Sequence, residues 1–145
     1  MAYTRILVWL DDSRSSIAAL RQAIGLAKEH GAEIHSLTVQ AAPHYQGAFG
    51  DIMEAPPIST GKYDRLVQAA RAVAQEADID LRPHLAFGSK GKAAKEFIEE
   101  NTVDLLVVGY AKTPPFCEWF AGSTFRRLVR LAPCPVLVVK QSLAR

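Results

Sequence analysis

The chain has 145 residues, of which 49% are hydrophobic and 22% charged, with a formal net charge of +2. This balance is typical of one globular domain with a substantial core, so we expect a single domain over residues 1–145. The small, scattered positive charge gives no basis for a nucleic-acid surface, and the apolar runs fall short of the roughly 20 residues that a membrane span needs. Two cysteines and no leader pattern before the first strand predict a cytoplasmic protein without a disulfide framework.

The first elements along the chain are a strand predicted at Ile6–Leu10 and a helix predicted at Ser13–His30. The strand is a continuous apolar run, which is typical of a parallel strand that is covered on both faces. The helix has an apolar stripe and suitable ends, with Ser13 as N-cap and Gly31 just after its last turn. A second strand is predicted at Glu33–Gln40, which completes a strand–helix–strand unit.

The middle of the chain begins with a long predicted loop at Ala41–Ile58, rich in proline and glycine. A loop of that length usually serves as a lid or binding loop, or is disordered. A second helix is expected at Gly61–Ala77 and a third strand at Asp80–Phe87. Because Pro83 cannot donate to a central ladder, the third strand is predicted to lie at an edge of the sheet.

In the last part of the chain, helices and strands again alternate. The predicted elements are a helix that follows the turn Gly88–Lys92 and ends near Asn101, a strand at Asp104–Val108, a helix at Phe125–Leu131 and a strand at Val136–Val139. Continuous apolar strands alternating with helices predict an α/β fold, a doubly wound five-stranded parallel sheet with helices on both faces. With right-handed crossovers and the third strand at an edge, the strand order 3-2-1-4-5 fits best.

In such a sheet, ligands bind outside the carboxyl ends of the first and fourth strands. The two loops that meet there are Leu10–Ser13 and Gly109–Ser123. Asp11 is expected on the ligand side. Asp12 is expected on the opposite side, as a turn or solvated residue, because neighbouring residues leaving a strand point apart.

The second of these loops ends at a helix start that carries Ser123 and Thr124, an arrangement suited to an anion. On one interpretation, N–H groups around Gly109 and Gly122 bind phosphates. On the other, the two glycines only let the chain turn. Lys112 lacks the conformational freedom of glycine, and the prolines at 114 and 115 have no N–H, although the Lys112 ammonium can itself reach a phosphate.

Other motifs favour structural interpretations. The Gly88–Lys92 turn lacks the spacing of a P-loop, so a helix-start turn is predicted there. Cys134 is predicted to be a packed residue, whereas reactivity of Cys117 is a secondary hypothesis. The four histidines show no metal-ligand spacing, and we find no constellation of nucleophile, base and metal that predicts strong catalysis.

Three segments of the chain resemble the universal stress protein family. They are ILVWLDDSRSSIAAL at Ile6–Leu20, DLLVVGY at Asp104–Tyr110 and GSTFRRLVRLAPCPVLVVK at Gly122–Lys140. The resemblance covers the whole chain and implies an adenine nucleotide alpha hydrolase-like fold with strand order 3-2-1-4-5. It also implies a homodimer joined through the fifth strands, and the apolar run Val136–Val139 on a predicted edge strand suits such pairing.

Nucleotide-binding members of this family share a loop with the pattern Gly, two residues, Gly, nine residues, Gly, then Ser or Thr. Here Gly109 and Gly122 match its ends, and Lys112 replaces the middle glycine. Trp9 stands where the family usually has a smaller residue, which puts room for the base in doubt. The resemblance implies an ATP or AMP site, with Mg²⁺ beside ATP, formed by the family's acidic position Asp11, the base-contacting position Val39, and Gly109, Lys112, Gly122, Ser123 and Thr124.

The leading hypothesis is a cytoplasmic regulatory module for the stress response with an adenine-nucleotide site. The alternative is a nucleotide-free member that acts through protein contacts, with Phe116–Phe120 and Tyr45–Met53 as its working surface. A third hypothesis is a slow nucleotide hydrolase that uses the same pocket.

Overall fold

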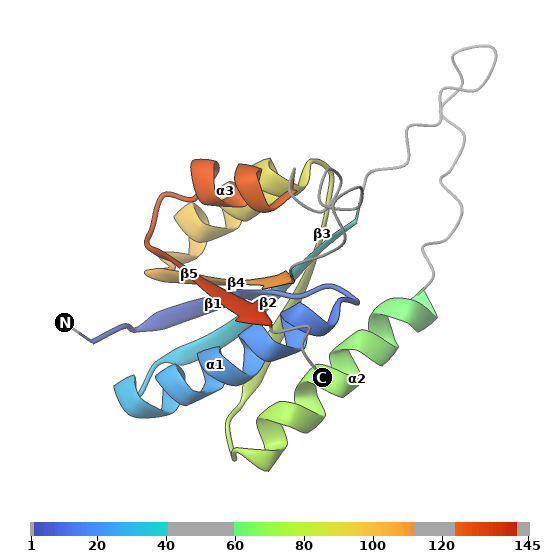
Figure 1. Ribbon diagram of the computed structural model, residues 1–145, viewed down its shortest axis with the longest axis vertical. Coiled ribbons are helices and arrows are strands. Elements are labelled where there is room, and N and C mark those ends of the chain that lie inside the picture. Colours follow the sequence, from blue (N-terminus) through green and yellow to red (C-terminus); the bar gives the residue numbers. More distant parts are fainter. Residues whose placement is uncertain (1, 41–59, 112–123, 142–145) are drawn as a thin grey trace, which may run out of the picture.

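The computed structural model describes residues 2–40, 60–111 and 124–141. The strands are β1 Arg5–Trp9, β2 Glu33–Gln40, β3 Leu81–Phe87, β4 Leu105–Ala111 and β5 Val136–Gln141; the helices are α1 Arg14–His30, α2 Thr60–Glu76 and α3 Lys90–Asn101, with a further helix at residues 124–131. All strand pairs are parallel, and the sheet order is β3-β2-β1-β4-β5. Figure 1 shows α1 and α2 on one face of the sheet and α3 with the helix at residues 124–131 on the other. The predicted doubly wound fold is confirmed.

Four of the five strands differ from their predicted bounds, by one to three residues. β3 begins at Leu81, and β4 runs to Ala111, so Gly109 lies in the strand and not at the start of the predicted loop.

Backbone pairing does not require apolar side chains, so a strand can begin or continue at polar residues. β1 begins at Arg5, which pairs with Glu33, and it ends at Trp9 rather than at Leu10. β5 continues past its apolar run, since Lys140 and Gln141 still pair with β4. The early end of β1 matters for the site, because the next three residues are free to form a turn.

The two ends of α1 follow local signals in the sequence. Ser13 is the N-cap, with φ −79° and ψ 151°, and its hydroxyl accepts a 3.2 Å hydrogen bond from the Ser16 amide. Gly31 closes the helix in the left-handed region, at φ 64°, where glycine is favoured. Both predicted caps are confirmed, and the N-cap fixes the turn between β1 and α1.

The sheet separates two apolar cores. The core on the α1 and α2 side includes Ile6, Val8, Leu20 and Ile24. The core on the α3 side includes Leu7, Trp9, Leu37, Leu106 and Leu128. Burial on both faces explains why the central strands read as continuous apolar runs.

The sheet edges also agree with the sequence. β3, which contains Pro83, pairs only with β2, and β5 lies at the opposite edge beside β4. Cys134 packs against the α3-side core, as predicted, and burial raises the pKa of its thiol. Within the described ranges, no helix combines the length and apolar character needed to cross a membrane.

Candidate functional site

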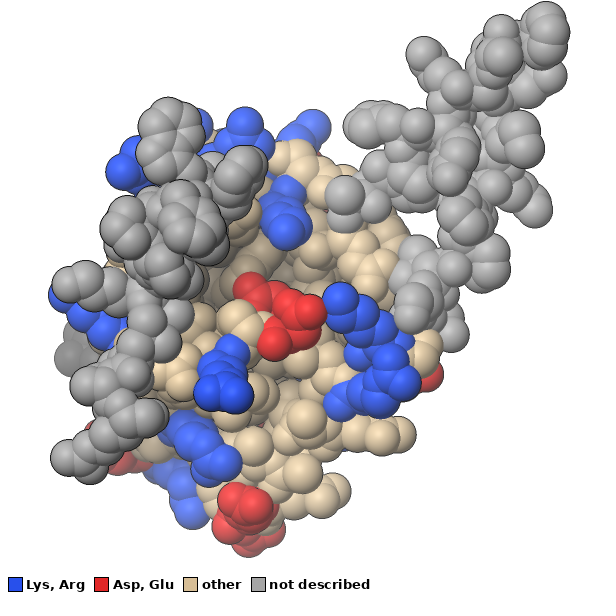
Figure 2. All heavy atoms as spheres, turned by 45° about the vertical axis from the view of Figure 1, so that its right-hand side comes forward, with Lys and Arg blue, Asp and Glu red and all other residues tan. Residues whose placement is uncertain are grey.

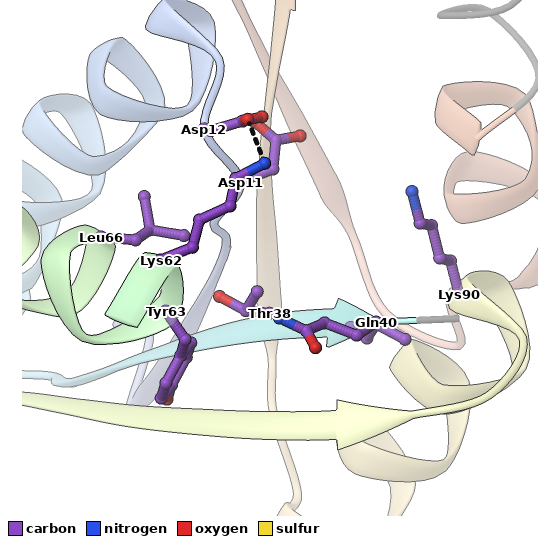
Figure 3. A pocket seen from close by; sticks show the side chains of 9 residues that line it. Asp11, Asp12, Thr38, Gln40, Lys62, Tyr63, Leu66 and Lys90 are labelled. Carbon is purple, nitrogen blue, oxygen red and sulfur yellow. Dashed lines mark ion pairs between the residues drawn. The ribbon is translucent and has the colours of Figure 1, made fainter. Parts of the chain in front are cut away.

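A hollow of about 350 Å³ opens at the carboxyl ends of β1 and β2. Its wall comes from the turn after β1, the end of β2, the first turns of α2 and the start of α3 (Figure 3). The lining residues are Asp11, Asp12, Thr38, Val39, Gln40, Lys62, Tyr63, Leu66 and Lys90. Figure 2 shows acidic side chains near the centre of one face of the molecule with basic side chains around them. The hollow has a size typical of small-ligand sites, about 300–1,000 Å³, and its lining carries both signs of charge.

Asp11 is held by hydrogen bonds in the turn between β1 and α1. The Ser16 hydroxyl donates to the Asp11 carbonyl at 2.7 Å and accepts from the Asp11 amide at 3.2 Å. One carboxylate oxygen of Asp11 accepts a 2.8 Å bond from the Ser13 amide. In the part of the chain that the structure describes, the other carboxylate oxygen has no hydrogen-bond partner. Asp11 therefore stabilises the turn and still has an acceptor to offer to a ligand.

Asp12 lines the same hollow as Asp11, and the expectation that the two point to opposite sides is wrong. Side chains alternate only along an extended strand, and β1 ends at Trp9, before the two aspartates. Asp12 Oδ2 lies 3.1 Å from Lys62 Nζ, with both side chains largely exposed. The hydrogen bond and charge of Lys62 hold the pKa of Asp12 below its ordinary value, and the charge of Lys90 acts in the same direction.

The end of β2 contributes Thr38 and Val39. The buried Thr38 hydroxyl donates a 2.9 Å bond to the Leu10 carbonyl, which ties the end of β1 to β2. The Leu10 amide donates to the Leu37 carbonyl at 3.0 Å. Backbone groups alternate in direction along a strand, so the amide and carbonyl of Val39 face the same side as those of Leu37, where β1 has ended. Thr38 was not among the predicted site residues, because the partner of its hydroxyl depends on the pairing of two strands.

Trp9 does not reduce the room in the hollow. Its side chain is 5% exposed and packs in the core on the α3 side, with Leu7 and Leu106. It is not among the residues that line the hollow. The large residue at this position fills the core below α3.

Position 109 has no room for a side chain. A Cβ added at this position would overlap the Ser15 carbonyl oxygen, because β4 passes directly beside the first turn of α1. The φ angle of Gly109 is not positive, so the conformational freedom of glycine is not what this position uses. Close packing is thus a third reason for glycine here, besides phosphate binding and chain turning, and Gly109 does not line the hollow.

The remaining predicted site residues belong to the predicted phosphate loop, of which the structure describes only Thr124. Thr124 begins the described part of the last helix, is partly buried and does not line the hollow. Lys112, Gly122 and Ser123 lie outside the described residues, as do Cys117 and the ranges Phe116–Phe120 and Tyr45–Met53. The structure therefore brings Asp11 and Val39 together and leaves the predicted phosphate loop as a prediction.

A second polar cluster lies at the amino ends of β1, β2 and β3 and consists of Arg5, Glu33, His35, Arg82 and His84; we call it the Glu33 cluster. His35 Nδ1 lies 2.9 Å from His84 Nε2, and His35 Nε2 lies 3.2 Å from a Glu33 carboxylate oxygen. Among the described residues, no group of three or more His, Cys, Asp or Glu side chains is arranged to hold a metal ion. The spacing of histidines along the chain could not show this pair, because strand register brings it together.

Comparison with known proteins places these features in a family. The model of the Universal stress protein family matches residues 2–140. A universal stress protein of Methanocaldococcus jannaschii is 27% identical over 141 residues, which cover 96% of this chain and 83% of that protein.

Solved structures show the same fold. One is a universal stress protein in complex with cAMP, with a TM-score of 0.71 and 22% identity over 96% of this chain and 98% of the other. Another is the universal stress protein from Archaeoglobus fulgidus in complex with dAMP, with a TM-score of 0.71 and 18% identity over 97% of this chain and 100% of the other. At these identities the likeness concerns the fold.

Proposed function

The chain belongs to the universal stress protein family, and we propose that it is a regulatory module that binds an adenine nucleotide in the hollow beside β1 and β2. The observation that carries this proposal is the meeting of Asp11 and Val39 in one hollow at the carboxyl edge of the sheet. The resemblance assigns Val39 to the base of a nucleotide and Asp11 to its ribose or phosphate side.

The polar groups of the hollow suit those two ends. The Val39 backbone amide and carbonyl face the side where β1 has ended, and such a donor–acceptor pair matches the edge of an adenine base. The second carboxylate oxygen of Asp11 can accept a hydrogen bond from a ribose hydroxyl, and a carboxylate is a strong acceptor. The apolar side chain of Leu66 and the ring of Tyr63 add a surface for the base.

The phosphate end of the ligand would be bound by residues of the predicted loop. Lys112, Gly122, Ser123 and Thr124 would supply a cation, amides and hydroxyls, with Mg²⁺ accompanying ATP. Two structures of the same fold, described with cAMP and dAMP, support an adenine mononucleotide as the ligand class. AMP is therefore the first ligand to test.

Thermal unfolding of the ligand-free protein, with and without AMP or ATP plus Mg²⁺, tests the proposal. A ligand at 100 times its dissociation constant adds about 2.7 kcal/mol of stability, which corresponds to a rise in Tm of about 5–10 °C for a domain of this size. Adenosine and GMP serve as ligand controls, and Gly122→Val controls for the predicted loop. An unchanged Tm at millimolar AMP, ADP and ATP would overturn the proposal.

A homodimer through β5 is the second part of the proposal. Among the described strands, β5 lies at the edge of the sheet and pairs only with β4, and its residues Val136–Val139 are partly buried. An exposed apolar edge invites pairing with a second copy. Sedimentation at micromolar concentration tests this assembly, and a single monomeric species would contradict it. The cytoplasmic location stays a prediction from the sequence.

A further inference from the structure

Lys90 forms the wall of the hollow across from the two aspartates. It is the first residue of α3, and in Figure 3 its side chain points to the side of β2 on which Asp11 and Asp12 lie. Lys62, the other cation of the lining, is bound to Asp12 at 3.1 Å. Lys90 makes no ion pair with another described residue, so its charge is available to a ligand.

The position of Lys90 is unfavourable for the helix alone. α3 carries Lys90, Lys92 and Lys95 in its first half and Glu96, Glu99 and Glu100 in its second, with no acidic residue in the first turn and no basic residue in the last. This order opposes the helix dipole, which favours acidic groups at the start and basic groups at the end. Lys92 shares this unfavourable placement, so the order of charges alone does not distinguish Lys90, whose side chain lines the hollow.

The two aspartates of the lining affect how well the hollow can hold an anionic group. Asp11 and Asp12 place negative charge on one side of the hollow, and this charge repels any anionic ligand group that enters it. Lys62 already offsets Asp12, whereas Asp11 has no ion pair in the described ranges. A positive charge on the opposite wall favours an anionic group in the hollow, in addition to the cation that Lys112 would supply, and Lys90 is the lining residue in that place.

We propose that Lys90 recognises the phosphate of the bound nucleotide and makes the hollow select a nucleoside phosphate over the nucleoside. This inference rests on the proposed nucleotide function and adds a specificity residue on α3, outside the glycine loop. A lysine binds phosphate as a compact point charge without a fixed geometry. Selection should therefore depend on ligand charge, and it should weaken as salt concentration rises.

Calorimetric titration of the full chain with AMP and with adenosine, at one fixed salt concentration, tests Lys90. We expect Lys90→Gln to bind AMP about tenfold more weakly, the loss typical of one hydrogen bond to a charged group, and adenosine within about twofold of the unchanged protein. Lys92→Gln is the matched control, because Lys92 is exposed in the same helical turn and does not line the hollow. Both variants should raise the Tm of the ligand-free protein, since each removes a positive charge from a helix start.

The outcomes separate this inference from the function on which it rests. If the unchanged protein binds AMP and Lys90→Gln keeps the full preference for AMP over adenosine, Lys90 is not the selecting residue and the nucleotide function stands. Equal weakening by Lys90→Gln and Lys92→Gln would mean a general charge effect and would also overturn the inference. If the unchanged protein binds neither ligand, both proposals fall.

Discussion

Charged and polar groups gather at both ends of β2. The two ends differ in how many of these groups find hydrogen-bond partners within the described part of the protein. At the amino end, the Glu33 carboxylate accepts from Arg5 Nε at 3.1 Å, His35 Nε2 at 3.2 Å and Arg82 Nη1 at 3.3 Å. At the carboxyl end, one oxygen of Asp11, the charge of Lys90 and the backbone of Val39 face an open hollow. Clustered charges and histidines do not by themselves mark a site, whereas hydrogen-bonding groups that the described residues leave without a partner do.

This difference predicts how mutations act at the two ends. Changes in the Glu33 cluster should alter stability and its pH dependence while leaving nucleotide affinity intact. Changes at the lining residues other than Thr38 should alter affinity with little effect on stability, because the turn is supported by a frame behind the hollow, made by the hydrogen bonds of Ser16 and Thr38 and by the close packing of Gly109. Each experiment below can break one side of this comparison.

The largest expected effect comes from Gly109→Ala, in the frame behind the hollow. The added methyl group would overlap the Ser15 backbone, so β4 or the start of α1 must move. Overpacking a tight contact lowers the free energy of unfolding by about 3 kcal/mol. Urea denaturation measures this loss.

Gly25→Ala is the control for Gly109→Ala. Gly25 is exposed within α1, and a methyl group added there would meet no neighbouring atom within 4 Å. Alanine is the better helix former, so this variant should gain up to about 1 kcal/mol. If Gly109→Ala is as stable as the unchanged protein, the frame is looser than the structure indicates and the comparison loses its basis.

A smaller effect is expected from the histidine pair, as a function of pH. Because Glu33 only accepts, His35 Nε2 carries the proton of that bond, and His35 Nδ1 then accepts from His84 Nε2. Burial, followed by the charges of His35 and Arg82, lowers the pKa of His84. A second proton on the pair would place two N–H groups face to face.

The sign of the pH effect follows from this lowered pKa. The unfolded chain takes up the proton near pH 6.5, more readily than the folded protein, so stability is full above that value and falls as pH drops through the folded pKa. His84→Gln should lose less stability than the unchanged protein between about pH 7.5 and 5.5. Hydrogen bonding from His35 lowers the pKa of Glu33 from 4.5, so the contribution of that carboxylate changes only in more acidic solution.

Thermal unfolding at several pH values, with AMP titration at pH 7.5, checks this prediction. Equal pH slopes for the two proteins would show that His84 is not the titrating group. A clear loss of AMP affinity in His84→Gln would show that the Glu33 cluster and the hollow are coupled, and the comparison between the two ends of β2 would fail.

Much of the fold follows from short-range patterns in the sequence. Continuous apolar runs identify the buried strands, Pro83 identifies an edge, and Ser13 and Gly31 mark the ends of α1. These signals act within a few residues, or through composition alone, so they can be read without knowing which strands are neighbours. The predicted order of the sheet needed only the handedness of crossovers in addition.

The site is harder to predict because its contacts join distant parts of the chain. The ion pair between Asp12 and Lys62 and the bond from Thr38 to Leu10 exist only once α2 and the strands are in place. The side to which Asp12 points depended on where β1 ends, and strand ends are the least certain feature of sequence patterns. For Gly109 the role in phosphate binding stays a prediction, and its packing against Ser15 has no local signal in the sequence.

The smallest change in stability, and the finest test of the comparison, comes from Asp11. Asp11→Ala removes the acceptor of the 2.8 Å bond from Ser13 and should lower the free energy of unfolding by about 1 kcal/mol.

Asp11→Asn keeps an oxygen for that bond, so its stability should stay within about 0.5 kcal/mol of the unchanged protein. The amide has a single neutral oxygen, which the turn already uses, and the ribose acceptor is lost. We therefore expect Asp11→Asn to bind AMP several-fold more weakly at nearly normal stability, measured by calorimetry and urea denaturation. Normal affinity in Asp11→Asn would mean that Asp11 serves only the turn, as the groups of the Glu33 cluster serve only one another.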